Sequence, residues 1–515
     1  MDSTIMLLIV LAYFAGLLVI AHFTSRNSDN QSFFVGNKKS KWWLVAFGMI
    51  GTSLSGMTFI SVPGTVGLGA FSYFQVVIGY WIGYFIVAFV LLPIYYKMNL
   101  TSIYTYLEKR LGINAHKTGA IFFILSRTVG ATLRLYLVIK VLEIFILEDL
   151  NVSFELTSIV ILLLILLYTY RGGVKTIVWT DTLQTTFMLL ALIISLIYVS
   201  HLLDANLVGS WNMATQNGLT KIFNTDVNSG GFFIKQIIGG MFITIAMTGL
   251  DQEMMQKNIS VSNLKDSQKN MSVMGTLQMA VVFIFLFLGA VLTMYAQSSQ
   301  MEVTAGDDLF PTIAIQSGLP FFISVCFIIG LISALFPSAD GALTALTSSF
   351  CIDILGINPK ETNQENEKKT TRTRLIVHSA FAVIFLLFIF FFREIDNGSL
   401  IDILLKLAGF TYGPLLGLFA FGILTKRYVK KFAPITVSLI SLVLTFILDS
   451  INNYQWYQDK MNWSESFKAQ ISNLNSILFG NYKIGVELIL MNGLITFIGL
   501  WLVSRKNKIQ VKSKD

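Results

Sequence analysis

The chain has 515 residues, of which 54% are hydrophobic and 13% are charged, and its formal net charge is +8. Soluble domains carry about 25% charged residues, so the composition excludes an ordinary water-soluble protein. The basic excess does not indicate nucleic-acid binding, because most Lys and Arg residues fall in alternate loops between apolar segments.

Apolar segments of about 20 residues with few charges predict transmembrane helices. Thirteen such segments follow one another along the chain, at 4–23, 43–66, 70–96, 118–147, 154–170, 177–202, 232–255, 271–296, 320–352, 375–393, 399–425, 432–450 and 482–504. The longest loops between them are too short for a second domain. We therefore expect an all-α integral membrane protein with a single transmembrane domain over 1–515.

The loop charges predict the orientation of these helices. Lys39, Lys41, Lys97, Lys109 and Arg110 belong to one set of alternate loops, whereas the opposite loops are poor in Lys and Arg. Because positive charge marks the cytoplasmic side, we expect the N-terminus outside and the C-terminus inside. The predicted location is the plasma membrane, which is the inner membrane in a Gram-negative cell. The basic loops serve topology and contact anionic lipid.

The second apolar segment is an unusual membrane helix. Its stretch Gly51–Gly64 reads Gly-Thr-Ser-Leu-Ser-Gly-Met-Thr-Phe-Ile-Ser-Val-Pro-Gly. Irregular backbone at membrane depth is tolerated only where it is buried in protein or lines a watery cavity. Broken helices of this kind indicate the binding site of a secondary transporter, although tight packing of small residues on neighbouring helices is the alternative.

The segments also predict an internal repeat. The segment at 232–255 is interrupted by Gly239-Gly240 and Thr248-Gly249, and it runs in the opposite direction to the first broken helix. We therefore expect two inverted units of five helices, 43–202 and 232–425, each opening with a broken helix. The helix at 4–23 precedes them, and two helices within 432–504 follow.

Two aspartates lie within apolar segments, where ionisable residues are costly and predict a functional site. Asp340 is deep in its segment, and Asp181 is about one turn from the end of its own. Pro337 frees a backbone carbonyl in the preceding turn, so this carbonyl, the Ser338 hydroxyl and the Asp340 carboxylate form an oxygen-rich region. Oxygen ligands of this kind suit a hard cation such as Na⁺. No nucleotide motif is present, so we expect an ion gradient to be the energy source.

Arg134 is near the middle of its segment and has no acidic residue close to it in the sequence. It either pairs with an aspartate on another helix or binds an anionic group of a substrate.

Four motifs in order resemble the sodium:solute symporter family over nearly the whole chain. They are the Gly51–Gly64 stretch, Trp179-Thr-Asp181 with Gln184, Asp251-Gln-Glu-Met-Met-Gln-Lys257, and the Ser/Thr-rich stretch 338–349 closing in Asp353. The first of these is most similar to bacterial sialic acid symporters. The resemblance implies a leucine-transporter-like fold.

The resemblance also implies sodium ligands. A first site would use the carbonyls of Gly51, Leu54 and Leu335 with the Ser338 hydroxyl, although Pro337 stands where the family usually has a second hydroxyl. A second site, present in some members, would use Asp181, Ser338 and Asp340. Asp340 replaces a serine there, so it either strengthens cation binding or holds a proton. One or two transported Na⁺ ions are both consistent with the sequence.

The resemblance implies a substrate site on the broken helices and their neighbours. The residues expected to contact the substrate are Ser53, Ser55, Thr58, Gln75, Tyr80, Arg134, Thr244 and Thr248. The arginine that binds the substrate carboxylate in sialic acid symporters would fall at Gly130, and Arg134 lies one turn further along the same face.

We therefore expect a sodium-coupled symporter that imports a small organic solute, such as a sugar, a sialic acid or another carboxylated solute, by alternating access. We expect it not to be an enzyme and to need no nucleic acid and no obligate protein partner. One alternative is a proton-coupled symporter of the same fold. A second is an intramembrane aspartyl protease using Asp181 and Asp340, although its Gly-x-Gly-Asp motif is absent. A third is a sensor or channel.

Overall fold

The computed structural model describes residues 3–25, 33–34, 39–303, 305–316, 319–358, 364–395, 400–461 and 463–505. In these ranges the chain is helical and has no β-strand, only two isolated β-bridges. The expectation of an all-helical membrane protein is confirmed.

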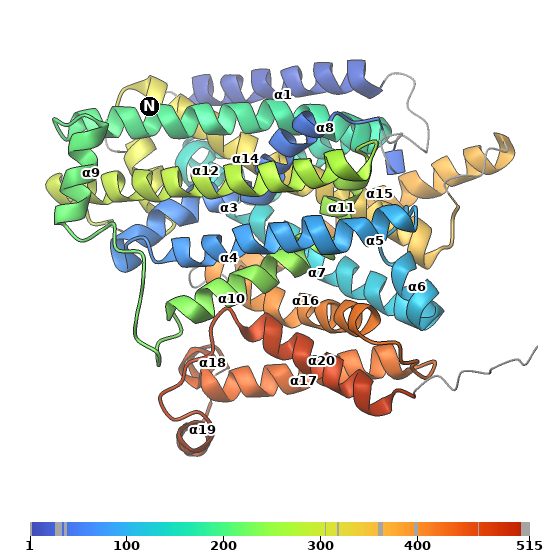
Figure 1. Ribbon diagram of the computed structural model, residues 1–515. Helices are drawn as coiled ribbons and strands as arrows, with labels where there is room; N and C mark the ends of the chain where they lie inside the picture. Colours follow the sequence, from blue (N-terminus) through green and yellow to red (C-terminus); the bar gives the residue numbers. More distant parts are fainter. Residues whose placement is uncertain are drawn as a thin grey trace, which may run out of the picture.

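The helices follow one another along the whole chain (Figure 1). Their bounds are α1 Ser3–Ser25, α3 Trp42–Gly69, α4 Tyr73–Ile86, α5 Leu92–Lys97, α6 Thr105–Leu111, α7 Ile113–Leu142, α8 Phe154–Leu202, α9 Leu207–Gln216, α10 Phe233–Thr244, α11 Gln252–Ile259, α12 Leu264–Ser298, α13 Leu309–Pro311, α14 Phe321–Ser349, α15 Gln364–Ile395, α16 Leu400–Leu424, α17 Ala433–Asn452, α18 Tyr454–Met461, α19 Glu465–Leu478 and α20 Leu488–Val503. Wider π-helical turns join or extend several of them, as at Val87–Leu91 and Ile245–Gly249.

Nine helices of the described residues are long and apolar enough to cross a membrane, and the number is eleven if each of two bent pairs is one span. Two shorter apolar helices, Phe154–Tyr170 and Leu488–Val503, come in addition. Phe154–Tyr170 is the first part of α8, which bends at Gly173 with φ 50°. Glycine adopts this left-handed conformation without the steric cost that a Cβ would bring, and the kink separates the two segments that the sequence predicts there.

The long loops contain short helices that the hydrophobic pattern does not predict. Asn206 caps α9 by accepting from the backbone N–H of Gly209, and Ser464 caps α19 by accepting from that of Phe467. Asn and Ser are both preferred N-cap residues, so the sequence carries a signal for the start of each of these helices.

The middle of the molecule is built around α14, which packs against α3 and α8. Helix α12 covers another side of α3, and α10 packs along α4. In Figure 1, α1 lies along α8 at one edge of the molecule, and α17 and α20 lie at the opposite edge beside α16. The first predicted broken helix, α3, is therefore an inner element. In the second, α11 is buried, whereas α10 exposes Ile234 and Ile238 on its outer face.

The first broken helix bends by 56° between Trp42–Gly56 and Thr58–Gly69. The non-helical residue is Ser55, with φ 51° and ψ 165°, so the interruption lies one turn after Gly51. Gly51 itself permits close packing, because a Cβ there would lie 2.4 Å from Oγ1 of Thr185 on α8. The carbonyls of the turn before Ser55 are those that a helix end leaves free of helical partners.

The second broken helix bends by 64° between Phe233–Gly249 and Gln252–Ile259. Asp251 starts α11 as its N-cap, with Oδ1 accepting from the N–H groups of Glu253 and Met254 at 2.9 and 3.3 Å. The tyrosine hydroxyls of Tyr95 and Tyr104 donate to the carbonyls of Gly249 and Leu250 at the break. Side chains therefore satisfy backbone groups that neither lipid nor the helix can serve.

The predicted interruption at Gly239-Gly240 is wrong, because both residues lie inside the regular helix α10. They are packing positions instead. A Cβ on Gly240 would lie 2.2 Å from the carbonyl oxygen of Val76, so glycine lets α10 approach α4 closely.

Candidate functional site

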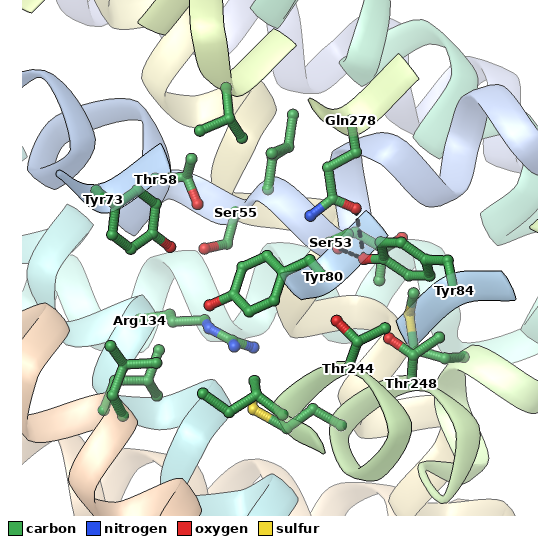
Figure 2. A pocket seen from close by; sticks show the side chains of 18 of the residues that line it. Ser53, Ser55, Thr58, Tyr73, Tyr80, Tyr84, Arg134, Thr244, Thr248 and Gln278 are labelled. Atoms are coloured by element: carbon green, nitrogen blue, oxygen red, sulfur yellow. Dashed lines mark hydrogen bonds between the residues drawn. The ribbon is translucent and has the colours of Figure 1, made fainter. Parts of the chain in front are cut away.

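A cavity of ≈ 90 Å³ lies between the two broken helices (Figure 2). Its walls come from α3, α4, α7, α10 with its π-turn, α11, α12 and α16. The lining residues are Thr52, Ser53, Leu54, Ser55, Thr58, Tyr73, Tyr80, Tyr84, Arg127, Arg134, Ile243, Thr244, Met247, Thr248, Met254, Gln278, Val282, Leu404 and Leu405.

Three tyrosines of α4 form one wall of the cavity. Tyr73, Tyr80 and Tyr84 recur at spacings of seven and four residues, which places them on one helix face. The hydroxyl of Tyr84 lies 3.0 Å from Oγ of Ser53 and donates to Oε1 of Gln278 at 2.5 Å (Figure 2). These two hydrogen bonds hold the first broken helix against α4 and α12. The side chains of Tyr73 and Tyr80 line the cavity itself.

Arg134 lies opposite these tyrosines, and its guanidinium ends near Tyr80 and Thr244 in Figure 2. The residue is 7% exposed, its Nε has no hydrogen-bond partner, and it forms no ion pair in the described part of the chain. A buried guanidinium without a carboxylate partner is costly. Of the two predicted roles for Arg134, the geometry favours binding of an anionic group in the cavity.

The rest of the wall is apolar. Ile243, Met247, Val282, Leu404 and Leu405 face the cavity from α10, α12 and α16. The cavity therefore combines two arginines, of which Arg127 is paired, with several hydroxyls and an apolar surface.

Most of the predicted substrate residues line this cavity. Ser53, Ser55, Thr58, Tyr80, Arg134, Thr244 and Thr248 all do. Gln75 does not. Its side-chain Nε2 donates to the carbonyls of Ser72 and Gly231, and its Oε1 accepts from the N–H of Asn224, so its amide joins α4 to a loop.

Four further residues line the cavity that are not among those expected from the sequence: Tyr73, Tyr84, Gln278 and Arg127. The heptad-like spacing of the α4 tyrosines and the isolated glutamine in the apolar α12 were available signals. Arg127 lies seven residues before Arg134, so both arginines share one face of α7.

The predicted ligands of the first sodium site lie on α3 and α14. Oγ of Ser338 donates to the carbonyl of Leu335 at 2.8 Å, and a Cβ on Gly56 would lie 3.6 Å from Cα of Leu335. The break in α3 and the Pro337 turn of α14 therefore adjoin one another. A hydroxyl that donates one hydrogen bond still offers lone pairs to a cation, so the carbonyl and hydroxyl set fits Na⁺.

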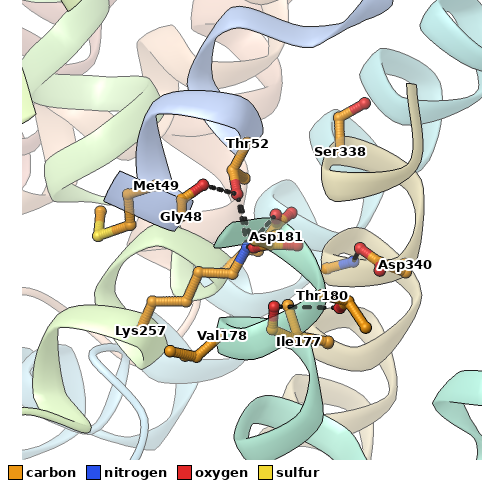
Figure 3. A network of polar contacts seen from close by, with 12 residues as sticks. Gly48, Met49, Thr52, Ile177, Val178, Thr180, Asp181, Lys257, Ser338 and Asp340 are labelled. Carbon is orange, nitrogen blue, oxygen red and sulfur yellow. Dashed lines mark hydrogen bonds and ion pairs between the residues drawn. The ribbon is translucent and has the colours of Figure 1, made fainter. Parts of the chain in front are cut away.

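Asp181 of α8 is fully buried and faces α3 and α11 (Figure 3). Its Oδ2 lies 2.7 Å from Nζ of Lys257 and accepts from Oγ1 of Thr52 at 3.1 Å. Lys257 also donates to Oγ1 of Thr52 at 2.7 Å. The three groups converge just before the Ser55 break.

Asp340 of α14 is also fully buried. Its Oδ2 accepts from the hydroxyl of Tyr168 at 2.7 Å, and its Oδ1 accepts from the N–H of Gly341 at 2.5 Å. Asp340 forms no ion pair among the described residues. The structure therefore holds the two predicted aspartates in different ways, one with a lysine and one with neutral donors.

A second ion pair continues the charged region toward the cavity. Arg127 pairs with Glu253 and lies 3.9 Å from Oδ2 of Asp251, which also accepts from the hydroxyl of Tyr412 at 2.7 Å. Oε1 of Glu253 lies 3.6 Å from Nζ of Lys257. We call Asp181, Lys257, Glu253 and Arg127 the charged cluster. All four are buried, so the removal of one partner would leave a costly unpaired charge.

Comparison with known proteins identifies this arrangement. The model of the "Sodium:solute symporter family" matches residues 33–436. The sodium/sialic acid symporter NanT of Aliivibrio fischeri is 24% identical over 495 residues, covering 93% of this chain and 92% of its own. The sodium-coupled monocarboxylate transporter 1 of Homo sapiens is 25% identical over 463 residues, covering 84% and 71%.

Among solved structures, a Na⁺-coupled sialic acid symporter in a substrate-bound outward-open state has the same fold. It superposes with a TM-score of 0.78 at 18% identity and covers 97% of both chains.

Proposed function

The chain belongs to the sodium:solute symporter family and couples solute import to Na⁺, and we propose that its solute is a small carboxylate bound by Arg134. It is a membrane transporter and not an enzyme, so Asp181 and Asp340 are not a protease pair.

The unpartnered guanidinium of Arg134 carries the proposal for the substrate. Among the described residues, two arginines line the cavity, Arg127 and Arg134. Arg127 pairs with Glu253, whereas Arg134 forms no ion pair with a carboxylate. A carboxylate is the natural partner of a guanidinium, which offers two parallel donors. The two relatives compared above are named for sialic acid and for monocarboxylates, and both of these substrates carry a carboxylate.

The size of the cavity supports a small solute. At ≈ 90 Å³ it is below the range of about 300–1,000 Å³ that is usual for drug-sized ligands. In the proposed complex the carboxylate contacts Arg134, and the hydroxyls of Ser55, Tyr73 and Tyr80 bind further polar groups. The apolar wall around Met247 and Leu404 excludes a ring covered with hydroxyls.

For sodium, the proposed ligands are the carbonyls of Gly51, Leu54 and Leu335 with the Ser338 hydroxyl. Asp340 adds negative charge two residues further along α14. The ion would join the break in α3 to α14, so its binding and that of the solute on the other side of the same break favour one conformation. Shared preference for one state is what coupling requires.

The proposed topology has thirteen spans, with the N-terminus outside and the C-terminus inside. The nine long helices, two bent pairs and two shorter apolar helices support it. The bent pairs, α3 and α10–α11, open the proposed inverted repeats 43–202 and 232–425, within a single domain. Residues 506–515, which carry part of the C-terminal charge, lie outside the described part of the chain.

A thermal stability panel tests the substrate proposal. Purified protein would be heated with lactate, N-acetylneuraminic acid, glucose or alanine, each in Na⁺ and in K⁺. A ligand that binds only the folded state raises its stability. We expect stabilisation by a small carboxylate in Na⁺ only, and its loss in Arg134→Gln. Stabilisation by glucose that persists in Arg134→Gln would contradict the proposal, and ligand effects that follow pH and not Na⁺ would favour proton coupling.

A further inference from the structure

The position beside Asp181, which the family resemblance makes a second sodium site, already holds a cation of the chain itself. Nζ of Lys257 lies 2.7 Å from both Oδ2 of Asp181 and Oγ1 of Thr52, and 3.6 Å from Oε1 of Glu253. Figure 3 shows the lysine side chain extending toward Asp181 and Thr52. An ammonium is a compact point charge, and here oxygens surround it as they would a small cation.

The buried carboxylates near the break in α3 differ in their partners. Lys257 neutralises Asp181, and Arg127 lies between Glu253 and Asp251. Asp340 remains with only the neutral donors Tyr168 and Gly341 among the described residues. Asp340 is therefore the predicted sodium ligand that has no cation of the described residues beside it, whereas the charge of Asp181 is already met by Lys257.

A free Na⁺ competes poorly with a tethered ammonium. Attachment to the chain gives a group an effective concentration of millimolar or more at its partner, and the short lysine stem confines it further. To reach Asp181, a Na⁺ would have to displace Lys257, which would leave the ammonium buried near Glu253 alone. The cost of an unpaired buried charge therefore favours the lysine at this position.

We propose that Lys257 permanently supplies the cation at Asp181, so that the protein couples each solute to one Na⁺ and not two. The inference rests on the sodium coupling of the proposed function and decides its stoichiometry. In this account, Lys257 determines how many Na⁺ ions are transported with each solute. For a solute with one negative charge, transport with one Na⁺ moves no net charge, so a tenfold Na⁺ gradient supports about tenfold accumulation at any membrane potential.

Equilibrium binding of ²²Na⁺ to the purified full-length protein tests this inference. We expect one ion per wild-type chain. Lys257→Gln removes the tethered cation, so a second Na⁺ can bind beside Asp181 and Asp340 in its place. With the ion at the Ser338 site, we expect two ions per chain. The double variant Asp181→Asn with Lys257→Gln removes the carboxylate as well, and we expect one ion again. A gain of a binding site is a result that a merely structural defect does not produce.

Two ions per wild-type chain would overturn the inference but leave sodium coupling intact. No bound ion in the wild type would overturn the sodium-coupled account itself. An unchanged count of one in a folded Lys257→Gln protein would show that the lysine does not set the ion number. If Lys257→Gln does not fold, the wild-type count and the potential dependence of transport in proteoliposomes still decide the question.

Discussion

Nζ of Lys257 lies 2.7 Å from Oδ2 of Asp181, although the two residues are 76 positions apart and belong to the separate helices α11 and α8. The contact joins the second broken helix to the helix that packs on the first. It lies in the interior of the protein, where both residues are nearly or fully inaccessible to solvent. Because Lys257 also donates to Oγ1 of Thr52 on α3, the two broken helices are linked by this hydrogen bond as well as by the cavity between them.

This pair predicts a stability pattern. Asp181→Asn or Lys257→Gln alone leaves a buried charge unpaired, which typically costs about 3–5 kcal/mol. We expect both single variants to unfold at clearly lower temperature than the wild type in detergent, and the double variant to recover much of the loss. Additive losses in the double-mutant cycle would show that the two residues do not interact.

The proposed role of the Ser338 hydroxyl as a Na⁺ ligand predicts how its removal changes the affinity for Na⁺. A hydrogen bond or ligand contact to a charged group contributes about 1.5–3 kcal/mol, so Ser338→Ala should weaken Na⁺ binding by about tenfold or more. Ser333→Ala is the matched control, because Ser333 is on the same helix but donates to the hydroxyl of Tyr13 on α1. The apparent Na⁺ affinity is read from the Na⁺ dependence of uptake. Equal effects of the two substitutions would remove Ser338 from the sodium site.

The proposed contact between Arg134 and the solute carboxylate predicts how substitutions of Arg134 change solute affinity. Arg134→Gln should lower the affinity for a carboxylated solute by about tenfold to a hundredfold, because a charged hydrogen bond is lost in a buried site. Arg134→Lys should keep part of it, since the charge remains but the two-pronged geometry does not. Lys140→Gln, on the same helix outside the cavity wall, is the control. Unchanged binding in Arg134→Gln would contradict the proposed substrate class.

Gly51 predicts a packing effect. A Cβ added there would lie 2.4 Å from Oγ1 of Thr185 and 3.4 Å from Cγ of Pro337. Gly51→Ala should therefore destabilise the protein and impair transport, and Thr185→Ala in the same chain should relieve much of the defect. Gly16→Ala, where nothing lies within 4 Å of the added Cβ, should be neutral. A fully stable and active Gly51→Ala protein would show that α3 and α8 adapt to the extra methyl group.

The fold was largely predictable because long apolar runs indicate membrane helices. The two bent pairs lie where small residues, Thr and Ser interrupt such runs. The position of each break was less predictable. Glycine serves both broken and closely packed helices, so the interruption predicted at Gly239-Gly240 is wrong. The one predicted at Thr248-Gly249 is confirmed, because the bend follows directly after Gly249 and Asp251 caps the next helix.

The site was predictable in part. The hydroxyls near Ser55 and the lone Arg134 are conspicuous in apolar segments, and they line one cavity. The partners of the charges were not predictable, because Lys257 reaches Asp181 only through the bend between α10 and α11. Gln75 has the residue type of a ligand but points to a loop, a distinction that depends on the tertiary structure.

Uptake into proteoliposomes tests the central claim most directly. A tenfold inward Na⁺ gradient would be imposed, and accumulation of the stabilising carboxylate would be compared with an equal K⁺ gradient. We expect accumulation above the outside concentration with Na⁺ and simple equilibration with K⁺. Accumulation that is indifferent to Na⁺ but follows an imposed pH gradient would contradict sodium coupling.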